Sequence, residues 1–175
     1  MKSFKRFLFV CVLAVSLISF ITETFKQNFQ QVFLQSIKGL ESLKGTATTS
    51  GHVCTVAFAE FNSVVIATDE SLGVLALTLT ANAGTDEAAA KKSLADWETQ
   101  IAALLPAGDY VRSQTYDADV VGYMKTIYDF NSGKMADKQK RPSIEMGVYM
   151  SGTEHQVRIK LFEPFFKNQY TPKMP

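Results

Sequence analysis

His52 and Cys54 are the pair of residues in this sequence that comes nearest to a chemical site. A thiol needs a neighbouring base that lowers its pKa before it acts as a nucleophile. In a strand, side chains two residues apart point to the same face, and His155 is the only other imidazole in the chain. A structural zinc site needs four ligands, so these three residues do not predict one. They leave open a hydrolase that uses Cys54 or a carboxylate, although no third group that would orient the base is evident.

The acidic residues indicate turns rather than catalysis. Asp69 and Glu70 lie in one expected turn, and Asp117 and Asp119 flank another. Short polar side chains in such places usually form hydrogen bonds with their own backbone. The sequence also lacks a Gly-x-Ser-x-Gly elbow and closely spaced glycines before a helix, which disfavours a serine hydrolase and a phosphate-binding loop. We therefore assign no catalytic residue, no metal and no cofactor from the sequence.

A cluster of cations marks the segment 131–141, which we expect to be a polar, mobile loop. The cluster consists of Lys134, Lys138, Lys140 and Arg141. A solvated loop is the ordinary interpretation of such a segment. The alternative is contact with an anionic surface, such as lipid headgroups or polysaccharide.

Aromatic residues gather near the C-terminus, where Phe165 and Phe166 follow Phe162 and precede Tyr170. Leaving them in water would cost about 25 cal/mol for each Å² of apolar area. We expect this tail to fold over the core or the helices. The alternative is a docking surface for another chain.

Two amphipathic helices are expected to position these residues. Apolar residues recur at helical spacing over 25–43, where Thr24 and Gln27 form a possible capping box. The polar stretch 46–51 is expected to be a connector. A second helix is predicted between Gly84-Thr85-Asp86-Glu87, which suits a helix start, and Pro106.

The remaining apolar runs predict strands, three before the second helix and up to four after it. Their ranges are 52–59, 61–68, 73–81, 110–115, 120–130, 143–150 and 156–162. Alternating apolar and polar residues, clear in the run 73–81 and in the last two runs, indicate a sheet with one buried and one solvated face. Because strands follow one another without intervening helices, we predict an α+β fold in the order α-β-β-β-α-β-β-β(-β). Six to seven antiparallel strands would carry both helices on one face.

The other face of this sheet is the expected contact surface. Strand parity places Tyr123, Tyr149, Arg158 and Lys160 there. Together with Phe165, Phe166 and the basic cluster, these are the candidate residues for binding a ligand or partner.

The N-terminus predicts export. Lys2, Lys5 and Arg6 precede an apolar run over 7–21, the pattern of a signal peptide. Fifteen helical residues at about 1.5 Å each are too short for the roughly 30 Å hydrocarbon layer of a bilayer. A cleaved signal over 1–21 and a single domain over 22–175 are therefore favoured over an uncleaved anchor. Bulky residues before Cys11 disfavour lipidation of that thiol.

Composition narrows the class of partner. The chain has 175 residues, 46% of them hydrophobic, and a formal net charge of +1, which provides no global field for nucleic acid. Cleavage after residue 21 would remove three cations and no acid, so the charge would become −2. The sequence contains no Asn-x-Ser/Thr acceptor, which fits a bacterial exported protein.

These features predict a periplasmic or extracellular, non-catalytic binding or envelope-associated protein. A membrane contact would require an uncleaved signal or the basic loop. One alternative is a carrier whose sheet and helices enclose a small apolar ligand, and another is the hydrolase described above. The sequence specifies neither the ligand, the partner nor the oligomeric state.

Overall fold

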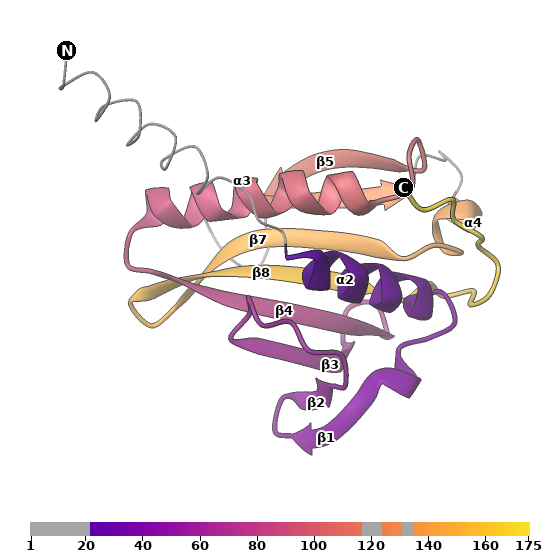
Figure 1. Ribbon diagram of the computed structural model, residues 1–175, viewed down its shortest axis with the longest axis horizontal. Coiled ribbons are helices and arrows are strands. Elements are labelled where there is room, and N and C mark those ends of the chain that lie inside the picture. Colours follow the sequence, from indigo (N-terminus) through magenta and orange to yellow (C-terminus); the bar gives the residue numbers. More distant parts are fainter. Residues whose placement is uncertain (1–21, 117–123, 131–134) are drawn as a thin grey trace, which may run out of the picture.

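An antiparallel sheet forms the centre of the chain in the computed structural model, which describes residues 22–116, 124–130 and 135–175. Within those residues the sheet has eight strands in the order β1-β2-β3-β4-β8-β7-β6-β5. The strands are β1 (Lys44–Thr48), β2 (Gly51–Cys54), β3 (Ser63–Asp69), β4 (Val74–Gly84), β5 (Tyr110–Tyr116), β6 (Met124–Phe130), β7 (Ser143–Ser151) and β8 (Glu154–Phe162). The helices are α2 (Glu23–Ser36), α3 (Glu87–Leu104) and the single turn α4 (Met135–Lys138), with a 3-10 turn η1 (Glu41–Leu43). Figure 1 shows α2 and α3 in front of the same face of the sheet.

The predicted α+β fold with an antiparallel sheet is confirmed. Six of the strands are seven residues or longer, and β1 and β2 add two short strands at one edge. Strand β1 corrects the expectation of a helix end and connector in this region. Its residues have no apolar alternation, and their pairing with β2 is irregular between Lys44 and Ala47. Backbone pairing at the edge of a sheet leaves no such pattern in the sequence, so periodicity did not predict β1.

Helix α2 is displaced from its predicted bounds. Thr22, rather than Thr24, is the N-cap, and its hydroxyl accepts a hydrogen bond from the backbone N–H of Phe25 at 3.1 Å. The helix ends at Ser36, and Gly39 follows with a φ of +115°, which side chains other than glycine rarely adopt. The last apolar residues of the predicted helix therefore lie in and before η1.

Helix α3 follows the prediction closely. The carboxylate of Asp86 is the N-cap, since it accepts hydrogen bonds from the backbone N–H groups of Ala88 and Ala89 at 2.8 and 3.2 Å. The helix ends at Leu104, just before the predicted proline stop. Its residues Ala90 and Ile101 are buried on the side that faces the sheet.

Aromatic rings fill the layer between the two helices and the sheet. The ring of Phe25 lies 5.0 Å from that of Trp97 on α3 and 5.9 Å from that of Phe29 on α2, centroid to centroid. The rings of Phe58 and Phe61, from the loop before β3, also contact Phe25, at 5.7 and 6.2 Å. These ring contacts join both helices to the loop before β3.

The C-terminal tail is partly folded over the core, as one interpretation of the sequence expected. Tyr170 is buried, and its hydroxyl forms a hydrogen bond with Asp109. Glu163, directly after β8, is 6% exposed. Its carboxylate accepts hydrogen bonds from the backbone N–H groups of Leu40 at 2.9 Å and Leu75 at 3.2 Å, and pairs with Lys167 at 3.0 Å. One acid thus joins the tail to the end of the α2 region and the start of β4.

Candidate functional site

The face of the sheet opposite α2 and α3, which we call the open face, carries most of the polar strand residues. The register sets Val65 beside Thr78, Thr78 beside Lys160 and Lys160 beside Glu145, so one row crosses β3, β4, β8 and β7. The apolar residues that alternate with them, such as Leu77 on β4, are buried on the helix side. The open face is therefore where a partner has access to the sheet.

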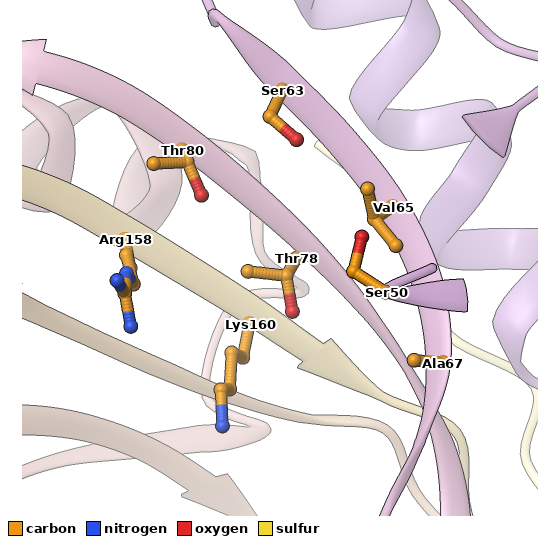
Figure 2. Close-up of a pocket in the computed structure, with 8 residues that line it drawn as sticks. All are labelled: Ser50, Ser63, Val65, Ala67, Thr78, Thr80, Arg158 and Lys160. Atoms are coloured by element: carbon orange, nitrogen blue, oxygen red, sulfur yellow. The ribbon is translucent and has the colours of Figure 1, made fainter. Parts of the chain in front are cut away.

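A hollow of about 280 Å³ lies on this open face (Figure 2). Its lining residues come from three neighbouring strands and from the turn between β1 and β2. They are Ser50, Ser63, Val65, Ala67, Thr78, Thr80, Arg158 and Lys160. Figure 2 shows the side chains of Arg158 and Lys160 extending in the same direction from β8, next to the threonines of β4.

Differences in side-chain length explain why the hollow forms here. Residues of β3 and β4 on this face are short, whereas those of β8 are long. At the β1–β2 turn, Gly51 has a φ of +136°, and a Cβ there would lie 2.6 Å from the carbonyl oxygen of Ile66. The same Cβ would lie 2.9 Å from that of Ala67, a lining residue. The absence of a side chain at Gly51 therefore lets this turn close one end of the hollow.

Arg158 is the cation of the hollow that has no acidic partner among the described residues. One of its terminal nitrogens donates to the side-chain oxygen of Gln156 at 3.0 Å. Its guanidinium carbon lies 4.9 Å from the centre of the Tyr149 ring. That ring in turn lies over Gly147, where a Cβ would approach it to 3.0 Å. Tyr149 and Arg158, both candidates from the sequence, thus lie together and hold the guanidinium in place.

Lys160, by contrast, shares its charge with an acid. Its ammonium lies 3.4 Å from the carboxylate of Asp69 at the end of β3. Partial burial acts to raise the pKa of Asp69, but a hydrogen bond from the Ser71 hydroxyl and the charge of Lys160 outweigh it, so this pKa is lowered. Asp69 therefore remains ionised at neutral pH. It also accepts from the backbone of Ser71 and Leu72, which supports its interpretation as a turn former.

Each cation of the basic cluster that the structure describes has a contact within the chain. Lys138 pairs with Asp129 at 2.7 Å, and Lys140 lies 3.8 Å from Asp137. The guanidinium of Arg141 lies 4.2 Å from the centre of the Tyr170 ring. Part of the segment expected to be a mobile loop is the helical turn α4. Lys134 lies outside the described residues, as does Tyr123.

Phe165 and Phe166 remain half exposed, at 50% and 46%. The backbone N–H of Phe166 donates to the carbonyl of Gln139 at 3.0 Å, and that of Asn168 to Ile37 at 2.8 Å. The tail backbone is thus fixed, while the two rings point away from the core. They lie apart from the hollow, whose lining includes neither of them.

Cys54 lies in the hydrophobic core beneath the helices and is buried. Burial raises the pKa of its thiol, and a backbone hydrogen bond from Val56 lowers it by less. His155 is on β8, three strands away from β2, which is about 14 Å at the usual strand spacing. His52 directs its Nδ1 to the carbonyl of Gly45 at 3.2 Å. Among the described residues, no hydrogen bond joins the thiol of Cys54 to either imidazole.

The thiol of Cys54 is expected to react slowly in the folded chain. A Cys11→Ser variant leaves Cys54 as the single thiol, because the sequence has two cysteines. We expect iodoacetamide at neutral pH to alkylate it at least roughly tenfold more slowly in the native state than in urea, since the thiolate is the nucleophile. Mass spectrometry of timed samples measures both rates. A native rate equal to that in urea, or to that of free glutathione, would mean an accessible thiolate and would support the alternative of a hydrolase that uses Cys54.

The described residues contain no group of three or more His, Cys, Asp or Glu side chains that could hold a metal ion. None of the helices in the described part of the chain combines the length and the apolar character that crossing a bilayer requires. The expected signal, residues 1–21, lies outside that part.

Sequence reasoning missed most of the hollow. Parity found Arg158 and Lys160, but not the short residues of β3 and β4 or Ser50. The available signal was the run Ser63, Val65 and Ala67 alternating along one strand. This run indicates a hollow only when the strand order is known. In that order β4 lies between β3 and β8, so the short residues of β3 lie on the same face as the long ones of β8.

Comparison of the chain with protein-family models, with curated proteins and with solved structures finds no match. Its function must therefore be inferred from its own side chains.

Proposed function

We propose that this chain is an exported, non-catalytic binding protein and that the open face of its sheet is the contact surface. The observation that carries the proposal is the hollow on that face with Arg158, a guanidinium held in position but without an acidic partner among the described residues. Stability alone does not require such a group, because surface charges contribute little even when they are paired. A guanidinium that is held in position, has no acidic partner and lies next to hydroxyl groups is instead suited to binding a ligand or partner.

Export is supported by the N-terminal pattern of three cations followed by an apolar run over 7–21. We expect the mature chain to begin near residue 22, outside the cytoplasm of the cell that makes it. Mass analysis of the N-terminus after cell fractionation tests this part. Recovery of the full chain from the cytoplasm, with Met1 retained, would refute export.

The contact surface is tested by placing a photo-crosslinking amino acid on each side of the sheet. Asn82 on β4 and Val111 on β5 are exposed, and the register assigns both to the open face. Lys92, exposed on α3, serves as the control on the helix side. We expect the same adduct from both open-face positions in envelope extracts and none from Lys92. Equal adducts from all three positions, or none from any, would contradict the proposal.

A further inference from the structure

We propose that the hollow binds a small polar ligand that carries one oxyanion group, a carboxylate or a phosphate, with Arg158 as the anchor. This inference rests on the proposed function, because it assigns a class of ligand to the open face.

Arg158 provides the geometry for an oxyanion. A guanidinium presents several N–H donors in a planar fork that matches carboxylate and phosphate oxygens. One donor is used by Gln156, and the flat face is occupied by the ring of Tyr149. These neutral contacts orient the group without neutralising it. The remaining donors have no carboxylate among the described residues to bind.

Lys160 is a secondary contact. It lies next to Arg158 on the same side of β8, with one residue between them. Its ion pair with Asp69 at 3.4 Å is partly exposed, so the ammonium keeps donors for a ligand while part of its charge is already balanced. We therefore expect the loss of Lys160 to weaken binding less than the loss of Arg158.

The rest of the lining defines the neutral part of the ligand. Four hydroxyl side chains, Ser50, Ser63, Thr78 and Thr80, surround the hollow, and each hydroxyl both donates and accepts hydrogen bonds. Such a lining suits a ligand with hydroxyl groups of its own. The volume of about 280 Å³ lies just below the usual range for ligand pockets, which starts near 300 Å³. A monosaccharide acid or a sugar phosphate has this combination of size, charge and hydroxyl groups.

Titration of the full chain with defined probes tests the class of ligand. Glucose 6-phosphate and glucuronate are the charged probes, and glucose and inorganic phosphate each carry one half of the proposed ligand. We expect binding of at least one charged sugar by calorimetry, with amide shifts in NMR spectra confined to β3, β4, β8 and the β1–β2 turn. Glucose and phosphate should each bind at least about tenfold more weakly. Glucose lacks the oxyanion that would bind Arg158, and phosphate lacks the sugar hydroxyl groups that would bind the serines and threonines. Equal binding of glucose, or no charged probe bound at millimolar concentration, overturns the proposal.

Variants test the residues. We expect Arg158→Gln to reduce the affinity at least about tenfold, Arg158→Lys to restore part of it, and Lys160→Gln to cause a smaller loss. Lys92→Gln removes the same charge from the helix side and should leave binding unchanged. An unchanged far-UV spectrum of each variant separates lost binding from lost folding. If Arg158→Gln binds as well as the native chain, the anchor is assigned wrongly and the proposal fails.

The two proposals fail separately. Absence of probe binding with crosslinking intact at Asn82 and Val111 would refute the ligand class and leave the contact surface. Probe binding without any crosslinked partner would refute the contact surface and leave the ligand class.

Discussion

Replacing Phe25 with alanine is expected to destabilise the folded chain by about 3 to 5 kcal/mol, the usual cost of truncating a buried phenylalanine. Phe25 is 1% exposed, and its ring contacts four others, from α2, α3 and the loop before β3. Truncation to alanine would leave a cavity where the ring was. Because the neighbouring rings are held by separate elements, we expect them to fill that cavity only in part. Whole domains are stable by only about 5 to 15 kcal/mol, so the loss is a large part of the total.

Urea unfolding of the full chain, followed by tryptophan fluorescence, measures this effect because Trp97 lies 5.0 Å from the Phe25 ring. Phe165→Ala is the matched control, since that side chain is half exposed. We expect it to change the free energy of unfolding by less than about 1 kcal/mol. Phe25→Leu keeps more volume and should give an intermediate loss if the alanine variant does not fold. Equal effects of Phe25→Ala and Phe165→Ala would show that the aromatic layer is not the core.

Replacing Glu163 with alanine is expected to cost roughly 3 kcal/mol, although Glu163 is a charged residue in the tail. Its removal leaves the buried N–H of Leu40 and the partly buried N–H of Leu75 without an acceptor, and each such group costs about 1 to 3 kcal/mol. The partner Lys167 contributes little to this figure, because its side chain is 41% exposed and solvent screens the pair. Glu163→Gln retains one acceptor oxygen and should lose less.

Two measurements test this prediction. Urea unfolding gives the total, and hydrogen exchange should show faster exchange specifically at the amides of Leu40 and Leu75. Glu41→Ala is the control, since Glu41 also pairs with a lysine, at 2.8 Å, but is exposed, so its removal should destabilise the chain far less than the removal of Glu163. If Glu163→Ala were no more destabilising than Glu41→Ala, the carboxylate would not be the link between tail and sheet.

Alternation along the strands was enough to predict the sheet and its buried face. The alternation of Val157, Ile159 and Leu161 predicted strand β8 and its buried face, and the whole α+β fold followed from such runs. The same parity assigned Arg158 and Lys160 to the open face. Periodicity works here because burial of one face is a local requirement on every second residue.

Other features depend on contacts between distant segments, which leave no local pattern. Strand β1 exists because its backbone pairs with β2. The turn after α2 is held by Glu163, more than a hundred residues later, which accepts the N–H of Leu40. The tail was expected to hide its aromatic rings, yet Phe165 and Phe166 stay exposed while Tyr170 is buried. Which ring enters the core depends on the available space, and only the packed structure defines that space.

The residue pattern alone predicts the antiparallel α+β fold, the two faces of its sheet and the two cations on the open face. The packed strands are needed to show that short residues of β3 and β4 lie beside those cations and that the β1–β2 turn closes one end of the hollow. They are also needed to show that Asp69 pairs with Lys160 while Arg158 has no acidic partner among the described residues. The difference is one of range, because burial acts on neighbouring residues along a strand, whereas a hollow and its electrostatics arise from the order in which separate strands pair.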